Sequence, residues 1–172
     1  HNDYLKPELL KNSDYFVNAV KWGLSQLPMN SKFIALNQLS NHDHSRWMTR
    51  TTQKVGRLGP NTHEEAIEGR DLDVFKMGLV MMFTLPGSPG LYYGDEIGLP
   101  GWTDPDNRRP YPWGRETEEG LEILQFTREL IKVYKNSTSL RRGSFDFIDW
   151  QKGYLAYASW NKEERIVTIV NR

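Results

Sequence analysis

The apolar run at residues 33–39 and the polar residues that follow it constrain this chain more than any other feature. Phe-Ile-Ala-Leu-Asn-Gln-Leu has the length of a strand and few charges. This predicts a strand covered on both faces, as in a parallel α/β sheet. In open sheets and barrels alike, the loop after such a strand carries the reactive side chains. The candidate functional residues are therefore Asn41, His42, Asp43 and Arg46.

Apolar residues recur at helical and strand spacings along the first 134 residues. The pattern predicts helices over residues 7–27, 65–85 and 117–134, the first capped by Asp14, and strands over residues 32–39 and 91–94. Long polar connections, residues 40–64 and 97–113, separate these elements. Helices that alternate with short apolar strands indicate a parallel sheet with right-handed crossovers.

The period of the apolar residues changes after residue 143 from helical to alternating. Three strands are predicted over residues 144–150, 154–160 and 165–170, separated by short polar turns. They form an antiparallel meander in a small separate unit, which places the expected domain boundary between residues 141 and 142. Because two parallel strands cannot close a barrel, the architecture is expected to be cut at both ends.

Charge and composition exclude several classes of function. The chain of 172 residues carries 22 basic and 22 acidic residues without a block of one sign, so nucleic acid is not an expected partner. It has no cysteine, which excludes disulfides and thiolate metal sites. Its most apolar segment, residues 77–85, is about half as long as a membrane span. The compartment stays open between cytoplasmic and secreted. A first residue other than methionine suggests that the chain was excised from a longer one.

Three motifs together resemble the α-amylase family of glycoside hydrolases, family 13. Residues 36–46 (Leu-Asn-Gln-Leu-Ser-Asn-His-Asp-His-Ser-Arg) are similar to the Asn-His-Asp signature at the end of barrel strand seven. Residues 87–98 (Gly-Ser-Pro-Gly-Leu-Tyr-Tyr-Gly-Asp-Glu-Ile-Gly) resemble strand eight. Residues 104–113 (Asp-Pro-Asp-Asn-Arg-Arg-Pro-Tyr-Pro-Trp) resemble the following loop of neopullulanase-like and maltodextrin-acting members. The resemblance implies the last quarter of a (β/α)8 barrel, followed by the start of a C-terminal β-sandwich domain.

The resemblance also implies retaining hydrolysis or transfer of α-glucosidic bonds in an α-glucan or maltooligosaccharide. By position, Asp43 matches the third carboxylate of the site and His42 the imidazole that binds the same sugar. An oxocarbenium-like transition state gains positive charge, so a fixed anion and hydrogen-bond donors stabilise it. The implied substrate-binding residues are Asn41, Arg46, Asp104 and Arg108. From its chemistry alone, Arg46 is suited to hold a carboxylate through a bidentate pair.

The nucleophile and the general acid of the family lie on barrel strands four and five, which have no counterpart in this chain. Asp95 and Glu96 cannot replace them, because adjacent side chains on a strand point to opposite faces, whereas a retaining pair lies about 5 Å apart. Glu64 with Glu65 and Glu163 with Glu164 are better explained as a helix start and a turn. The chain alone is therefore predicted to lack glycosidase activity.

Other interpretations of the same residues stay open at this point. His42, Asp43 and His44 could form a metal site, although adjacent residues rarely ligate one ion. Asp104 and Arg108 could form an ion pair within their loop. The chain could also be a non-catalytic carbohydrate-binding or scaffold protein that reuses half of the barrel. No cofactor is indicated, and neither is calcium, although the parent enzyme could bind it. Open sheet edges predict self-association.

Overall fold

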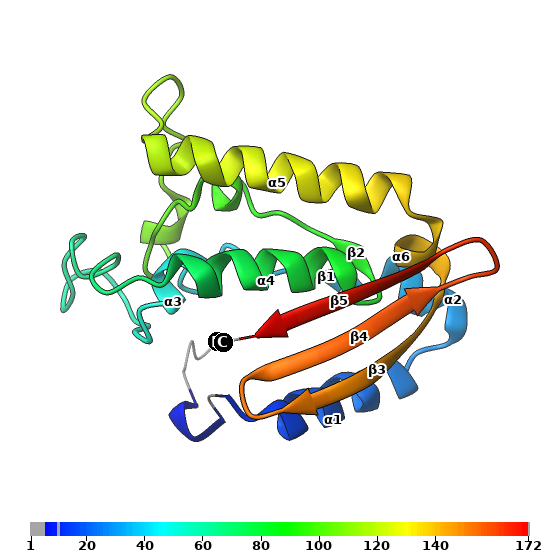
Figure 1. The fold of residues 1–172 in the computed structure, drawn as a ribbon. Coiled ribbons are helices and arrows are strands. Elements are labelled where there is room, and N and C mark those ends of the chain that lie inside the picture. The colour runs from blue at the N-terminus through cyan, green and yellow to red at the C-terminus, as the bar shows by residue number, and fades with distance from the viewer. Residues whose placement is uncertain (1–5, 10, 172) are drawn as a thin grey trace. The chain divides into compact units, whose positions relative to one another are not determined.

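The computed structural model describes residues 6–9 and 11–171 and divides the chain into two compact units (Figure 1). The first unit contains Gln38–Met82 and Gly90–Leu130, and the second contains Lys6–Asn37, Phe83–Pro89 and Ile131–Arg172. The units alternate along the chain, and helices α4 (Leu72–Thr84) and α5 (Glu118–Asn136) pass from one into the other. A domain boundary between residues 141 and 142 stays a prediction.

The second unit contains the predicted meander. Strands β3 (Ser144–Gln151), β4 (Tyr154–Trp160) and β5 (Arg165–Asn171) form an antiparallel sheet in the order β3-β4-β5, which confirms the three strands predicted after residue 143. The central strand β4 is buried over five consecutive residues, whereas β5 alternates between exposed and buried positions. The register pairs Tyr157 with Phe147 on one side and with Thr168 on the other.

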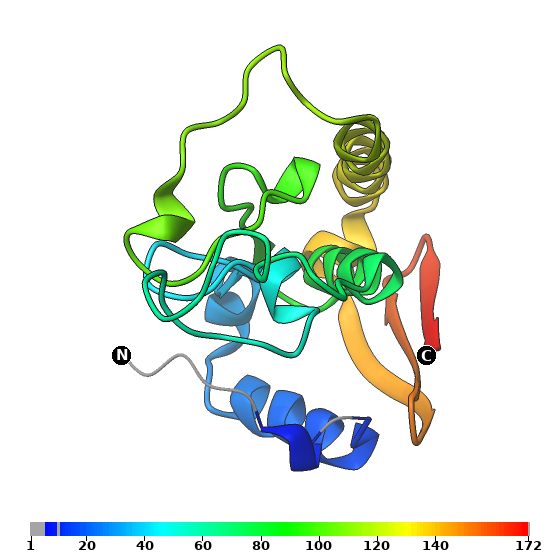
Figure 2. The ribbon, with the colours of Figure 1, turned by 90° about the vertical axis from the view of Figure 1, so that its left-hand side faces the viewer.

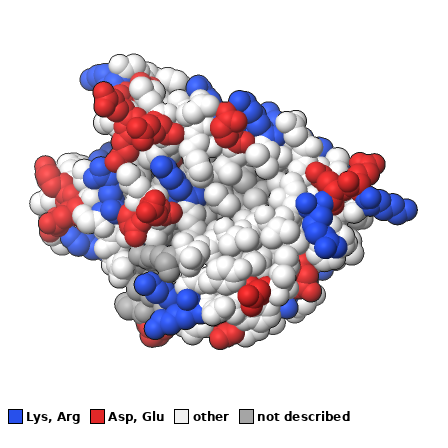
Figure 3. All heavy atoms as spheres, in the orientation of Figure 1, with Lys and Arg blue, Asp and Glu red and all other residues white. Residues whose placement is uncertain are grey.

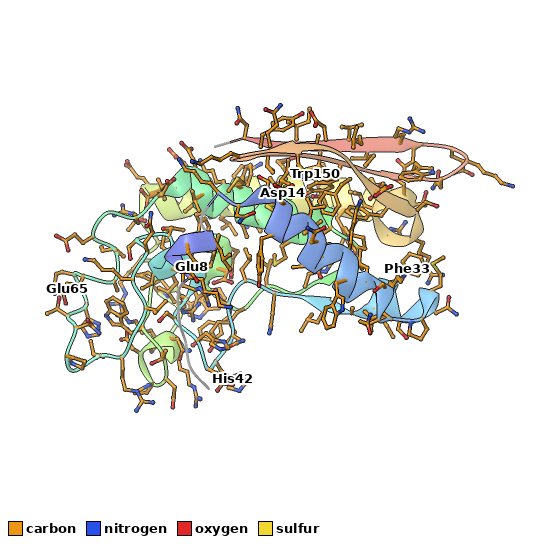
Figure 4. All side chains as sticks on the ribbon, turned by 90° about the horizontal axis from the view of Figure 1, so that it is seen from below. Glu8, Asp14, Phe33, His42, Glu65 and Trp150 are labelled. Carbon is orange, nitrogen blue, oxygen red and sulfur yellow. The ribbon has the colours of Figure 1, made fainter. Side chains whose placement is uncertain are left out.

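Helix α1 (Ser13–Ser25) packs against strand β3 of this sheet. The Phe16 ring meets the Phe147 ring edge to face at 6.5 Å between centroids, and the Trp150 Nε1–H donates to Asp14 Oδ1 at 2.8 Å (Figure 4). The predicted cap was wrong, because the side chain of Asn12 accepts the Tyr15 N–H and caps the helix. The predicted start at residue 7 was also wrong: residues 7–9 form a separate 3-10 turn, η1 (Pro7–Leu9).

Glu164 joins the β4–β5 turn to the short helix α6 (Thr138–Arg142). Its Oε1 accepts the Ser139 N–H at 2.7 Å and the Ser137 hydroxyl at 2.8 Å, at the first residues of α6. These donors, the Ser139 N–H first, hold the pKa of the Glu164 carboxyl below its ordinary value. The prediction that Glu163 and Glu164 lie in a turn is confirmed, since they lie between β4 and β5.

A second, two-stranded sheet in this unit is parallel, as predicted, but the first predicted strand was too long and the second was misplaced. Strand β1 (Leu36–Asn37) pairs with β2 (Ser88–Pro89), whereas residues 29–34 form helix α2 (Met29–Ile34). The helix takes the first half of the apolar run because the Ala35 N–H still donates to the Ser31 carbonyl. The second strand lies before residues 91–94, since the Ser88 N–H donates to the Ala35 carbonyl. Leu36 is 64% exposed, so β1 is not covered on both faces.

The first unit is built around α4, the first part of α5 and the short helix α3 (Trp47–Arg50). Its apolar core includes buried Met48, Phe75, Leu79, Trp102 and Ile123. Helix α4 begins at Leu72 rather than at residue 65, and the Asp71 carboxylate accepts the Val74 N–H at its first turn. The predicted helix over residues 117–134 is confirmed as α5.

Gly78 lets helix α3 approach helix α4 closely. A Cβ at this position would lie 2.5 Å from the Trp47 Nε1, and this indole N–H donates to the Phe75 carbonyl at 3.2 Å. The contact fixes the start of α3, directly after the polar loop of residues 40–46. Figure 2 shows most of the remaining first unit as loops beside α4.

The surface in Figure 3 carries both signs of charge interspersed, without a patch of one sign on the face in view. Among the described residues, no helix has the length and apolar character that crossing a membrane requires.

The Tyr157 hydroxyl provides a test of the second unit's core. Tyr157 is fully buried, and its hydroxyl lies 2.7 Å from Thr84 Oγ1. Burial, opposed by this contact, raises the pKa of Tyr157 to about 12. We expect Tyr157→Phe to lower the free energy of unfolding by about 1 to 2 kcal/mol, because a buried hydrogen bond is lost, measured by urea denaturation. Tyr154→Phe in the same strand is the control, since its hydroxyl has no hydrogen bond to any described residue. Equal losses in both variants would contradict this assignment.

Candidate functional site

The loop between β1 and α3 carries the candidate functional residues. Two of its titratable side chains are accessible, with 66% of the His42 side chain and 38% of the Asp43 side chain exposed. Figure 4 places His42 at the periphery of the loop region, pointing away from the core. The His42 Nε2 lies 3.6 Å from Asp43 Oδ1, so the imidazole and the carboxylate face the same side. The pair is open to a ligand from solvent.

Asn41 shapes the turn that presents this pair. Its Oδ1 accepts the N–H of Asp43 at 2.9 Å and that of His44 at 3.1 Å, and lies 3.1 Å from His44 Nδ1. An Asn side chain that bonds to backbone two and three residues ahead fixes a tight turn. Its oxygen is thus committed within the loop.

Arg46 and Asp95 form a buried centre beneath the loop. Their side chains are 0% and 1% exposed, and the Arg46 Nη1 lies 3.7 Å from Asp95 Oδ1. The guanidinium also donates from Nε to the Asn107 carbonyl at 2.9 Å and from Nη1 to the Tyr93 carbonyl at 2.6 Å. Its Cζ lies 4.5 Å from the centroid of the Tyr92 ring, within the range of a cation–π contact.

This geometry corrects the expectation of a bidentate pair for Arg46. It does hold a carboxylate, but through a single close approach. It lies at the end of the loop, because α3 begins only at Trp47 and Arg46 precedes the helix as its cap residue. Its complete burial suits an anchor of the loop better than direct contact with a sugar.

Ser40 connects the buried carboxylate to the backbone of the loop. Its hydroxyl donates to Asp95 Oδ1 at 2.8 Å, and its oxygen accepts the Trp47 N–H at 2.8 Å. Burial raises the pKa of the Asp95 carboxyl to about 7, whereas the Ser40 hydrogen bond and the Arg46 charge act in the opposite direction. The carboxyl therefore changes its protonation near neutral pH.

The sequence pattern predicted a strand that ends at Asp95 and Glu96, and this was wrong. They begin a short 3-10 helix, η2 (Asp95–Ile97), after Gly94 in the left-handed conformation with φ 88°. The chain turns here because the Leu99 N–H donates back to the Gly94 carbonyl. Glu96 accepts the Gly94 N–H at 2.7 Å, while Asp95 faces the buried centre.

Asp104 and Arg108 pair with each other, which was one of the two interpretations of these residues. The Arg108 Nε lies 3.1 Å from Asp104 Oδ1, and both side chains are about half exposed. The same Nε donates to the His42 carbonyl at 3.3 Å. The pair therefore lies beside the candidate site and remains accessible to a ligand.

Two further groups of this loop were not predicted. Asp106 in the 3-10 helix η3 (Asp106–Arg108) accepts from Arg109 through both oxygens, at 2.9 and 2.7 Å, and from the Trp102 N–H. These bonds outweigh burial and hold the pKa of Asp106 below its ordinary value. The side chain of Asn107 donates to the carbonyls of Asn41 and His44. The spacing of the sequence gives no signal for the contacts of Asn107, since they join segments more than 60 residues apart, whereas those of Asp106 are local.

Within residues 6–9 and 11–171, no three His, Cys, Asp or Glu side chains come together as a metal site. Trp102 is fully buried, and its indole N–H donates to the Thr62 carbonyl, so it belongs to the core. Trp113 is 79% exposed and lies 4.3 Å from the Tyr111 ring.

Comparison with known proteins identifies relatives of this chain. The family described as the alpha amylase catalytic domain matches residues 9–139. A cyclomaltodextrinase of Geobacillus thermopakistaniensis is 30% identical over 159 residues, which are 91% of this chain and 24% of that protein. Neopullulanase 2 of Thermoactinomyces vulgaris is 31% identical over 137 residues, covering 78% of this chain and 20% of that protein.

A solved structure gives the same result for the fold. The debranching enzyme of Nostoc punctiforme, soaked with acarbose, superposes with a TM-score of 0.75 at 25% identity, over 96% of this chain and 30% of that one. The structure is thus part of an alpha-amylase catalytic domain fold, a mixed α/β arrangement with a small three-stranded antiparallel sheet. The chain spans about a quarter of the length of the curated relatives it matches.

The raised pKa of Asp95 predicts how stability depends on pH. Because the folded state binds this proton more tightly than the unfolded state, the carboxyl's contribution to stability is present at low pH and is lost as the pH rises through about 7. We expect the wild-type chain to lose about 2 to 3 kcal/mol more than Asp95→Asn between pH 5 and pH 8, measured by urea denaturation.

Asp149→Asn is the control for this prediction. Asp149 is an exposed carboxylate on β3, so this variant should keep the wild-type pH dependence. An Asp95→Asn variant with the full wild-type difference between pH 5 and pH 8 would refute the assignment.

Proposed function

Because this chain belongs to the α-amylase family of glycoside hydrolases, we propose that it is the C-terminal portion of a retaining enzyme that cleaves or transfers α-glucosidic bonds in α-glucans or maltodextrins. The observation that carries this proposal is the exposed His42–Asp43 pair, which lies in the family's Asn-His-Asp motif on a turn held from beneath by buried Arg46. The cyclomaltodextrinase and neopullulanase among its relatives support an α-glucan substrate.

Within this proposal, β1 and β2 correspond to the last two strands of the (β/α)8 barrel. Their parallel pairing and the helices α3 and α4 between them agree with one βαβ unit of such a barrel. The three-stranded sheet β3-β4-β5 then corresponds to the start of the C-terminal β-sandwich domain.

The proposed chemistry assigns Asp43 to the transition state and His42 to the sugar. The carboxylate of Asp43 stabilises the positive charge that develops on the ring, and the imidazole of His42 donates to a sugar hydroxyl. Asp104 and Arg108 lie beside this pair and bind neighbouring sugars. Asn41 and Arg46 contribute by shaping and anchoring the turn.

The same assignment makes the isolated chain inactive. Retaining hydrolysis needs a carboxylate nucleophile and a carboxylic acid on opposite sides of the bond, about 5 Å apart. The family places both on barrel strands for which this chain has no matching motif. Asp43 alone stabilises charge and does not form the covalent intermediate.

We expect the 172-residue chain to show no turnover of maltoheptaose, measured by chromatography of the products. In the protein as isolated from its source, we expect an intact mass above that of this chain, together with turnover. There, Asp43→Asn should lower kcat by about 10² to 10³, because one group that stabilises the transition state is lost. Asp149→Asn, an exposed carboxylate on β3, is the matched control and should leave kcat unchanged.

Two outcomes would contradict this proposal. Turnover by the 172-residue chain that Asp43→Asn abolishes would place the complete chemistry within it. A source protein of the mass of this chain, which binds maltoheptaose without turnover, would instead favour a non-catalytic carbohydrate-binding protein.

We also infer that the isolated chain associates with itself through the edge of β1. Within the described residues, β1 pairs only with β2, and Ile34 and Leu36 beside its free edge are 77% and 64% exposed. Light scattering should therefore give a mass that rises with concentration, and Leu36→Lys should reduce it. A monodisperse monomer over a wide concentration range would rule this out.

A further inference from the structure

We propose that Asn107 is a positioning residue that holds the turn of residues 41–44 and thereby directs the side chains of His42 and Asp43. Its functional importance rests on the proposed sugar site, whereas its effect on the turn does not. The residue is completely buried in η3, more than 60 residues further along the chain.

The side-chain amide of Asn107 bridges the two ends of the turn. Its Nδ2 donates to the Asn41 carbonyl at 3.1 Å and to the His44 carbonyl at 2.8 Å. One planar group with two donors thus fixes the distance between two carbonyls on either side of His42 and Asp43. Asn41 Oδ1 binds the N–H groups of the same turn, so the backbone is held through both its donors and its acceptors.

Asn107 is itself held in a fixed place. Its carbonyl accepts the Arg46 Nε–H at 2.9 Å, and the Arg46 N–H donates to the Gly101 carbonyl at 2.8 Å. A Cβ at Gly101 would lie 2.9 Å from the Asn107 Cα, so only glycine permits this close approach. Arg46 therefore fixes the backbone of Asn107, while the side chain of Asn107 fixes the backbone before Arg46.

The chemistry of the site favours an amide over other side chains of this size. Asn107 Oδ1 is buried without a hydrogen-bond partner among the described residues, which costs free energy of folding. The two bonds donated by Nδ2 oppose this cost. Asp at this position would place carboxylate oxygens against two carbonyls. Leu would leave both carbonyls without their donor in a buried place.

His42 and Asp43 depend on this backbone because their own side chains have few contacts. Among the described residues, their side chains make one close approach, the 3.6 Å between His42 Nε2 and Asp43 Oδ1, and the side chains are 66% and 38% exposed. Their direction is therefore set by the turn. A loosened turn would spread the two groups over many orientations before a sugar binds.

Amide hydrogen exchange of the 172-residue chain, measured by NMR, tests the proposal. We expect Asn107→Asp to speed exchange at the Asp43 and His44 N–H groups at least tenfold beyond the change in global stability, and Asn107→Ser, which keeps one donor, to give a smaller increase. If Asn107→Asp does not fold, Asn107→Ser alone decides. The control is Thr51→Val, because the buried Thr51 Oγ1 accepts the Asp71 N–H away from this turn. Thr51→Val should change exchange at the Asp43 and His44 N–H groups only by as much as it changes the global stability.

Titration with maltoheptaose, followed on the His42 and Asp43 resonances, separates this proposal from the proposed function. Suppose that the wild-type chain binds maltoheptaose, that Asn107→Asp binds it at least tenfold more weakly, and that Thr51→Val binds it as the wild type does. The sugar site and the role of Asn107 then both gain support. If the wild-type chain does not bind, the sugar site loses support, and exchange still decides the role of Asn107. The proposed role of Asn107 would be overturned if, in both Asn107 variants, exchange at Asp43 and His44 changed only by as much as global stability.

Discussion

The buried guanidinium of Arg46 is the group on which the rest of the first unit depends. Burying a charged side chain costs several kcal/mol unless hydrogen bonds and an opposite charge compensate. Here the compensation comes from three groups on two chain segments: the Tyr93 carbonyl and the Asp95 carboxylate on one, and the Asn107 carbonyl on the other. Arg46 joins these segments because no helix or sheet does so, and removal of its charge would leave Asp95 buried without a cation.

Periodic elements were predictable because their pattern is local. The alternation of residues 144–170 and the helical stripe of residues 117–134 gave β3, β4, β5 and α5 nearly to their ends. The apolar run at 33–39 did not reveal where α2 ends and β1 begins, because a short run suits a helix end as well as a strand. The Asn37 side chain, which donates to the carbonyls of Leu85 and Pro86, ties this segment through contacts that no period encodes.

The site shows the same division between local and distant information. The sequence pointed to His42 and Asp43, and the structure places both side chains at the surface. It also pointed to Arg46 as a substrate-binding residue. The burial of Arg46 depends on segments that meet only in the fold, so the sequence could not show that it anchors the loop instead. Asn107 carried no signal at all, because one Asn in a polar loop has no distinctive spacing.

An anion that stabilises a developing positive charge must be fixed in place without being neutralised. A guanidinium placed directly on Asp43 would hold it well but would compete for its charge. In this structure, Arg46 donates to backbone carbonyls and to Asp95, Arg108 pairs with Asp104, and Arg109 pairs with Asp106. Asp43 is held through its backbone N–H by the neutral amide of Asn41. The guanidinium groups near the loop thus act on its backbone and on other carboxylates. The carboxylate proposed to face the sugar has no guanidinium partner among the described residues, and its own backbone N–H is held by a neutral amide.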